Sequence, residues 1–360
     1  MAATAQRLVG WLRRSAPARP FEAFQVEVTS RCNLKCVMCP VTVLAEHWPA
    51  RDMAWETFER AADAFARTQW VYLQGWGEPL LHRRIFDMIE RAKQAGCRVG
   101  FTTNGTRLTH GAGARLLDLE LDLLAVSIAG ASAATHEAIR VGSDFAKLLE
   151  NLRGFLEQRR GSRPKVEILY LMTPQNLAEL PRAAELAAAL GVDELVATNL
   201  DYVITPGLDA LRAYNEGLPA RALEQARAAA RRCGIAFRSY PLEYREMAVC
   251  DLNPLKILFV SAEGDVSPCV YTSLTGQSSI PRVFEGRALE VPVVRFGNLN
   301  ERPLAEIWDG AAYREFRARF AKRVAGASHM VLGALASGAV AEQETPPPEA
   351  CRSCPKLFGV

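Results

Sequence analysis

The sequence lacks a marked excess of charge, because 43 Lys and Arg residues face 40 Asp and Glu residues and the formal net charge is +3. It also has no long basic stretch interleaved with aromatic residues, so we expect no nucleic-acid partner. Long hydrophobic runs are missing too: the apolar stretches at 8–12 and 330–341 fall short of the roughly 20 residues of a membrane span. We therefore expect no membrane partner either.

Cysteines are few, with nine in 360 residues, and they are unevenly placed. A small secreted protein held together by disulfides has a denser cysteine framework, and the apolar part of the N-terminal segment is shorter than that of a typical signal peptide. Clustered cysteines in a chain without a secretion signal are typical of metal ligation in a reducing compartment. The sequence therefore predicts a cytoplasmic, metal-binding protein.

Short β-rich runs alternate with longer helical patterns from Phe21 onwards, which favours repeated βα units and a parallel sheet. The expected strands are Ala23–Val28, Trp70–Gln74, Arg98–Thr102, Leu121–Ile128, Val166–Leu171 and Glu194–Ala197. The expected helices between them are Trp55–Ala66, Arg84–Ala95, Ala112–Asp118, Phe145–Arg159 and Leu177–Leu190. In such a fold the loops after the strands' carboxyl ends meet at one mouth, where ligands bind.

Three cysteines, Cys32, Cys36 and Cys39, lie in one short loop directly after the first expected strand. Iron–sulfur clusters are usually held by four cysteines, so a cubane held by three leaves one iron open to a small molecule. A zinc site is the alternative, but it normally has four ligands, and His47 is the nearest candidate for the fourth.

The Cys-x3-Cys-x2-Cys spacing resembles the signature of the radical S-adenosylmethionine (radical SAM) superfamily. The run Gly75–Pro79 looks like that family's glycine-rich element, and the run Thr103–Thr106 looks like its Thr-Asn-Gly element. The resemblance implies a [4Fe–4S] cluster on the three cysteines, with S-adenosylmethionine (SAM) on the open iron. It also implies a partial (β/α)6, TIM-like barrel. Carried over in the same way, the cofactor-binding residues are Gly75, Trp76, Gly77, Glu78, Asn104 and Ser127. Arg140 is a further candidate, because its guanidinium suits the cofactor carboxylate, and a solvated arginine at a helix end is the alternative.

A second set of cysteines, Cys250, Cys269, Cys351 and Cys354, lies in the C-terminal region, and Gly264 precedes Cys269 by five residues. This arrangement is similar to the SPASM/Twitch auxiliary-cluster domain and implies a second [4Fe–4S] cluster. Four cysteines rather than seven favour the shorter Twitch form with one auxiliary cluster. A structural zinc site built from the same four thiolates is the alternative. We expect the two remaining cysteines, Cys97 and Cys233, to be ordinary buried thiols.

The expected division of the chain follows from these motifs. It has an N-terminal extension at 1–20, a radical SAM core at 21–205, a helical connector at 206–248, and an auxiliary-cluster domain at 249–360 that contains a β-hairpin, a helix and a flexible insertion near 325–349. Within the extension we expect a helix.

The expected activity is reductive cleavage of SAM and hydrogen abstraction from a substrate, giving a net two-electron oxidation with the auxiliary cluster as electron acceptor. A peptide or protein maturase is the first alternative, and a non-catalytic iron–sulfur electron carrier or redox sensor is the second. About thirty residues precede Cys32, too few for a leader-recognition domain, which favours a small or carrier-bound substrate over a peptide. A flavodoxin- or ferredoxin-type reductant is the expected partner. No catalytic base is assigned among Tyr271, Asp265 and Glu243.

Overall fold

The computed structural model describes residues 19–214, 221–337 and 345–360. Its main sheet has the strand order β14-β11-β10-β1-β3-β4-β5-β7-β8-β9, and every neighbouring pair from β10 to β9 is parallel. These strands are β1 (Phe21–Val26), β3 (Thr68–Tyr72), β4 (Arg98–Thr103), β5 (Leu123–Ile128), β7 (Lys165–Leu171), β8 (Glu194–Thr198), β9 (Ala236–Ser239), β10 (Ile257–Val260), β11 (Asp265–Ser267) and β14 (Gly297–Asn298).

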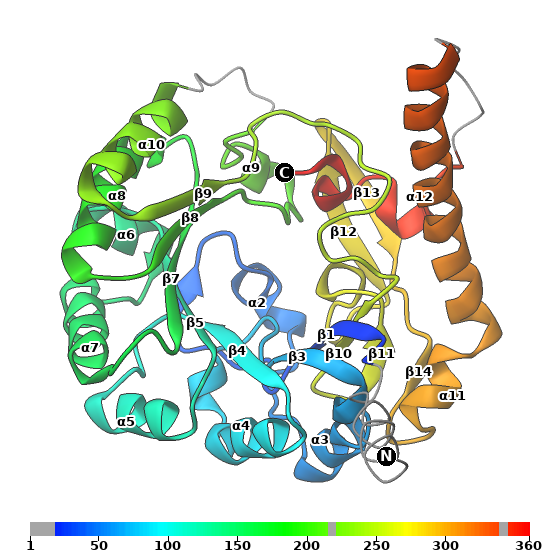
Figure 1. The fold of residues 1–360 in the computed structure, drawn as a ribbon, viewed down its shortest axis with the longest axis horizontal. Helices are drawn as coiled ribbons and strands as arrows, with labels where there is room; N and C mark the ends of the chain where they lie inside the picture. The colour runs from blue at the N-terminus through cyan, green and yellow to red at the C-terminus, as the bar shows by residue number, and fades with distance from the viewer. Residues whose placement is uncertain (1–18, 215–220, 338–344) are drawn as a thin grey trace, which may run out of the picture.

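The sheet curves into a crescent without closing, because β9 and β14 at its two ends do not pair with each other (Figure 1). This confirms the expected partial barrel. Helices cover the outer side of the crescent: α3 (Trp55–Ala62), α4 (Ile85–Gln94), α5 (His110–Asp118), α6 (Ala133–Ile139), α7 (Phe145–Gln158), α8 (Leu180–Leu190) and α10 (Arg221–Cys233).

Helix α7 shows why these segments fold as they do. Its buried residues Phe145, Leu148, Leu152 and Phe155 recur every three or four positions and therefore form one apolar stripe against the sheet. The Asp144 side chain accepts a hydrogen bond from the Lys147 backbone N–H and so caps the first turn.

The observed elements lie close to the expected ones, and each of the six expected strands begins and ends within two residues of its prediction. The helix expected at Leu177–Leu190 starts with a 3₁₀ turn, Leu177–Glu179, and continues as α8. Helix α6 and strand β9 were not expected, because both are short segments without a clear apolar period.

The C-terminal region extends the same sheet. Strand β10 pairs with β11 as the expected ribbon, but it also lies parallel to β1. A second hairpin is formed by β12 (Ser279–Phe284) and β13 (Arg287–Pro292), and the helices α11 (Leu304–Trp308) and α12 (Ala311–Ser337) follow it. Figure 1 shows this region closing the open side of the crescent.

Helix α12 continues to Ser337, into the stretch near 325–349 that was expected as a flexible insertion. Alanine has the highest intrinsic helix propensity, so an alanine-rich run prolongs a helix that has already formed. The expected connector at 206–248 contains α9 (Pro206–Asp209), α10 and also β9. The expected N-terminal helix and residues 338–344 lie outside the described residues. No helix among the described residues is long and apolar enough to span a bilayer.

Candidate active site

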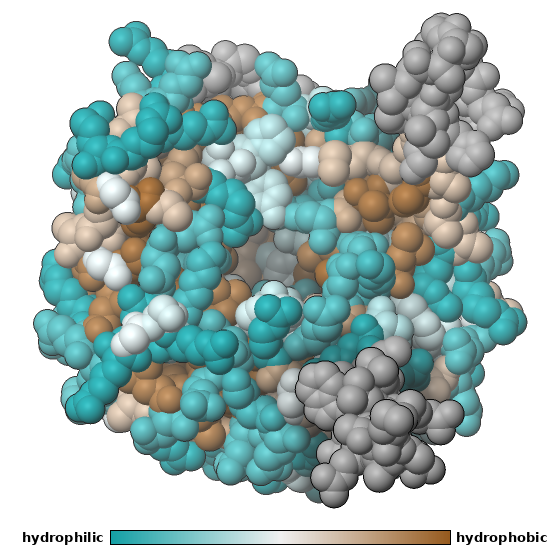
Figure 2. All heavy atoms as spheres, in the orientation of Figure 1, coloured by the Kyte–Doolittle hydropathy of each residue, from teal (hydrophilic) through white to brown (hydrophobic). Residues whose placement is uncertain are grey.

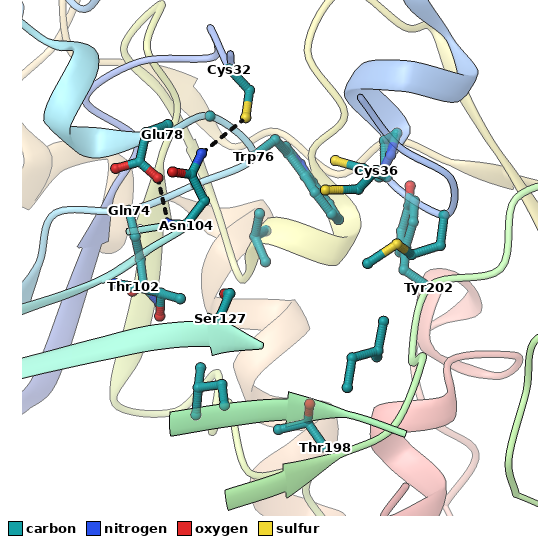
Figure 3. A pocket seen from close by; sticks show the side chains of 18 of the residues that line it. Cys32, Cys36, Gln74, Trp76, Glu78, Thr102, Asn104, Ser127, Thr198 and Tyr202 are labelled. Carbon is teal, nitrogen blue, oxygen red and sulfur yellow. Dashed lines mark hydrogen bonds between the residues drawn. The ribbon is translucent and has the colours of Figure 1, made fainter. Parts of the chain in front are cut away.

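A pocket of about 370 Å³ opens inside the crescent, where the parallel strands end. Figure 2 shows the molecule hollowed at its centre, and Figure 3 shows side chains from several strands converging there. The pocket is lined by every residue that the sequence predicted for the SAM-binding site: Cys32, Cys36, Cys39, Gly75, Trp76, Gly77, Glu78, Asn104, Ser127 and Arg140. Strand order therefore brings together motifs that are far apart in the chain.

The three-cysteine loop is shaped by short backbone pairings. Cys36 belongs to β2 (Lys35–Cys36), which pairs with β6 (Arg140–Val141), and Cys39 caps the short helix α2 (Pro40–Val43). The Cys39 N–H donates to the Cys36 carbonyl over 3.1 Å, which holds these two residues on one turn. Figure 3 shows the Cys32 and Cys36 side chains entering the same pocket.

The environment of these thiols fits a cationic metal group. Burial, and to a smaller extent the neighbouring Cys36 thiol, raises the pKa of Cys39 to about 12 and also raises that of Cys32. A metal cation reverses this effect, because it deprotonates the thiols that bind it. Two donors already face the sulfurs: the Asn104 side-chain amide lies 3.8 Å from Cys32 Sγ, and Arg140 Nη1 lies 3.9 Å from Cys36 Sγ.

The donor set fits a cluster, because three thiols that line one pocket can each bind a different iron of a cubane. Among the described residues, no group of three or more His, Cys, Asp or Glu side chains is placed so that it could hold a single metal ion.

The glycine-rich loop after β3 lies against the backbone that leads into the cysteine loop. An added Cβ at Gly77 would lie 2.3 Å from the Thr29 carbonyl oxygen and 2.6 Å from that of Arg31, so only glycine fits there. The Glu78 N–H donates to the Arg31 carbonyl over 2.8 Å. These contacts expose the loop backbone to the pocket.

Glu78 is buried, and its carboxylate accepts hydrogen bonds from Thr103 Oγ1 at 2.8 Å, the Asn104 N–H at 2.7 Å and the Leu80 N–H at 3.1 Å. Burial raises the pKa of Glu78, and these hydrogen bonds oppose the rise. Both carboxylate oxygens therefore hold the protein's own loops together. The geometry suits a supporting role for Glu78 beneath the loop backbone.

Arg140 has a buried Nε with no hydrogen-bond partner within the described residues, on the side of the pocket that carries the cysteines. An unpaired guanidinium N–H at that position suits an anionic oxygen of a ligand. Ser127, at the end of β5, also faces the pocket (Figure 3).

Sequence reasoning missed an aromatic wall of the pocket. The rings of Trp76, Tyr202 and Tyr271 lie together, with centroids 4.8 Å apart for Trp76–Tyr202 and 5.6 Å apart for Tyr202–Tyr271. Thr198, Asn199 and Asp201 line the pocket beside them. The loop after the sixth expected strand, Glu194–Ala197, should face the mouth like the other loops. This rule could have identified residues 198–202 as pocket residues.

The second cysteine set also comes together in space. Burial raises the pKa of Cys250, Cys269 and Cys351, and the thiols of the set add to this rise in one another. None of the four thiols forms a disulfide. Four mutually close thiols match the donor set of an iron–sulfur cluster.

The second cysteine set adjoins the pocket through two residues. Tyr271, two residues after Cys269, lies on the aromatic wall, and Lys356, two residues after Cys354, pairs with Asp201 over 2.8 Å. The pocket that the three-cysteine loop lines is thus also bordered by residues that adjoin the second thiol set.

The remaining candidates lie elsewhere. Cys97 is buried as expected and donates to the Phe65 carbonyl at 3.1 Å, but Cys233 is exposed at the end of α10, because the last turn of that helix faces solvent. Of the three residues considered as bases, Asp265 is paired with Arg295 over 3.2 Å and Glu243 is exposed. Only Tyr271 lines the pocket.

Two family models match the chain, and their spans agree with the two thiol sets. The radical SAM superfamily model matches residues 26–187, and the SPASM iron–sulfur cluster-binding domain model matches residues 250–355. The first span contains the three-cysteine loop and the second contains the other four cysteines.

This chain resembles known proteins over most of its length. The tungsten-containing aldehyde ferredoxin oxidoreductase cofactor-modifying protein of Pyrococcus furiosus is 29% identical, over 81% of this chain and 82% of its own length. The PqqA peptide cyclase of Ruegeria pomeroyi is 27% identical, over 93% and 80%. The crystal structure of Streptococcus suis SuiB bound to its precursor peptide SuiA shares the fold, with a TM-score of 0.60 at 14% identity, over 88% and 71%.

The radical SAM domain implies a SAM-binding [4Fe–4S] cluster, and the SPASM domain implies auxiliary iron–sulfur binding. The homologous proteins are enzymes, so this chain is one too and not a mere electron carrier. The motifs, the strand order, the pocket and both domain matches agree: this chain belongs to the radical SAM superfamily and carries an SPASM domain in its C-terminal region.

Proposed function

We propose that this enzyme oxidises a substrate C–H centre by two electrons in the pocket that its three-cysteine loop lines and that residues next to its second thiol set border. The observation that carries the proposal is the shared pocket: its lining includes the three-cysteine loop and also Tyr271 and Asp201, which adjoin the second thiol set. A substrate held between them would lie near both a site of hydrogen abstraction and an electron acceptor.

Cys32, Cys36 and Cys39 would hold the SAM-binding cluster, and Cys250, Cys269, Cys351 and Cys354 would hold one auxiliary cluster. When bound, the clusters and SAM supply a 5′-deoxyadenosyl radical that takes a hydrogen atom from substrate, and an acceptor for the second electron. The substrate thus loses one hydrogen atom, one electron and one proton.

The residues of the pocket bind and orient these groups. The backbone of Gly75–Gly77, held by Glu78, would contact the methionyl amine of SAM, and Arg140 and Ser127 would contact its carboxylate or ribose. The aromatic wall of Trp76, Tyr202 and Tyr271 would pack against the substrate and exclude water. Catalysis by such a radical requires this exclusion, because side reactions with solvent compete.

The test is formation of 5′-deoxyadenosine by anaerobically reconstituted protein given SAM and dithionite. We expect the wild-type protein to form it and Cys36→Ala to form none. A flavodoxin- or ferredoxin-type protein would replace dithionite in the cytoplasm. Wild-type protein that holds its clusters and binds SAM but forms no 5′-deoxyadenosine would refute the proposal.

A peptide or protein maturase is the second candidate, and the likeness to the PqqA peptide cyclase favours it. The two candidates differ in where the abstracted hydrogen comes from. Extracts of the source organism grown in deuterated medium can be separated into peptides and small molecules. The fraction that transfers deuterium into 5′-deoxyadenosine contains the substrate, so deuterium from the peptide fraction would establish the maturase and deuterium from the other fraction would exclude it.

A further inference from the structure

Glu27 is a buried acid that no motif predicted and that the proposed function does not use. It follows β1 directly and is 0% exposed. Its Oε1 accepts a hydrogen bond from the Trp76 backbone N–H at 2.9 Å. Its Oε2 accepts from the Ala262 N–H and from Thr275 Oγ1, both at 3.3 Å. One carboxylate therefore joins the glycine-rich loop to two loops of the SPASM-matching region.

The glycine-rich loop is built around this side chain. An added Cβ at Gly75 would lie 2.4 Å from Glu27 Cγ and 2.5 Å from its Oε1. Glycine at this position thus lets the loop backbone close over the carboxylate, and the Trp76 N–H is aimed at it. Glu27 itself does not line the pocket, whereas Gly75, Trp76 and Gly77 do.

We propose that Glu27 is a positioning residue, which holds the Gly75–Trp76 backbone in its SAM-binding position. Because Glu27 also accepts hydrogen bonds from the SPASM domain, that position depends on how the SPASM domain packs against the radical SAM core. The inference rests on the SAM site proposed above. This role explains why an acid is buried between two domains although no cation among the described residues faces it.

The ionisation state of Glu27 gives this role a pH signature. Burial raises the pKa of Glu27 to about 7, the bonds from Trp76, Ala262 and Thr275 oppose the rise, and nearby Glu263 adds to it. Glu263 is the charged group that faces Glu27, and it pairs with Arg51 over 2.7 Å. Because hydrogen bonds to a charged acceptor are the stronger ones, we expect SAM affinity to fall as the pH falls through about 7.

The experiment measures SAM affinity of the anaerobically reconstituted holoenzyme by equilibrium dialysis, over about two pH units centred on 7. Glu27→Gln keeps the shape but replaces one acceptor oxygen by a donor amide. We expect its Kd for SAM above pH 7 to rise about tenfold or more, and its pH dependence to disappear.

A second variant tests the coupling between the domains without touching the pocket. Thr275→Val removes one hydrogen bond that lowers the pKa of Glu27, so we expect the midpoint of the pH dependence to move to higher pH. The matched control is Thr57→Val, which removes a bond from a buried threonine to Asn300 across the same two domains but does not remove a hydrogen bond to Glu27. We expect the control to keep the wild-type midpoint.

Wild-type affinity of Glu27→Gln at every pH would overturn the inference. So would an unmoved midpoint in Thr275→Val, or an equal shift in Thr57→Val. If Glu27→Gln does not fold, Thr275→Val decides alone. Protein that binds SAM with the expected pH dependence but forms no 5′-deoxyadenosine would refute the proposed function and leave this inference intact.

Discussion

Gly77 is a residue where one methyl group would disturb the proposed cofactor site. Its missing Cβ leaves room for the backbone oxygens of Thr29 and Arg31, which cannot move without shifting the cysteine loop. We expect Gly77→Ala to lower the free energy of unfolding by about 1–3 kcal/mol. It should also weaken SAM binding, because the loop backbone must retreat from the pocket. Thermal unfolding and equilibrium dialysis with SAM check the two effects.

Gly154 gives the matched control for this substitution. It lies inside α7, and an added Cβ there meets no atom within 4 Å. Alanine is a better helix former than glycine, so Gly154→Ala should raise the free energy of unfolding by about 1 kcal/mol and leave SAM binding unchanged. Equal losses in the two variants would contradict the account of Gly77.

At the residue scale, the sequence motifs placed the cysteines and the glycine-rich loop, because their spacing is local. Glu27 and Tyr202 could not be found in this way. Glu27 depends on hydrogen bonds to Ala262 and Thr275, more than 230 residues away in the chain. Tyr202 looks like any buried tyrosine until its ring is seen beside Trp76. Such positions follow from the packing of domains, which no local pattern encodes.

At the scale of elements, one buried ion pair ties the C-terminal 3₁₀ turn, Pro355–Phe358, to the loop after β8. Lys356 Nζ lies 2.8 Å from Asp201, and both side chains are largely buried. Although burial lowers it, the carboxylates of Asp201 and Asp251 raise the pKa of Lys356 above its ordinary value, so the lysine stays charged.

We expect Lys356→Met to lower the free energy of unfolding by about 3 kcal/mol, because it leaves Asp201 buried without its cation. The double variant with Asp201→Asn should recover part of this loss. The control is Lys256→Met, which breaks an exposed pair with Glu22 and should cost less than about 1 kcal/mol. Denaturant unfolding of the four proteins gives these values, and equal losses for Lys356→Met and Lys256→Met would show that the buried pair has no special weight.

The elements themselves were predictable where the apolar period and the turn residues agree. Examples are the six expected strands, which are β1, β3, β4, β5, β7 and β8. The pairing of β10 with β1 was not, because a parallel contact between Ala23 and Ile257 leaves no mark in either segment. The continuation of α12 beyond residue 325 was not predicted either. Small residues there indicate flexibility only outside a helix, and α12 had already begun at Ala311.

For the whole molecule, the shared sheet makes the two domains one continuous structure around the pocket. Strand β10 lies between β1 and β11, so the C-terminal region completes the sheet beside the strand that leads to the three cysteines. This arrangement explains how the three-cysteine loop and residues next to the second thiol set, separated by more than 200 residues, come to border one cavity. It also predicts that the two sets can be emptied separately, because no cysteine is shared between them.

Iron content tests this independence. Two cubanes give about eight irons per chain in the reconstituted wild-type protein. We expect Cys39→Ala and Cys351→Ala to retain about four each, with 5′-deoxyadenosine formation lost in the first and retained in the second. Cys233→Ala is the control, because that thiol is exposed and belongs to neither set, and it should keep all the iron. Wild-type protein with about four irons, unchanged in Cys351→Ala, would show that the C-terminal thiols hold no iron–sulfur cluster, and zinc bound to them would then establish the alternative metal.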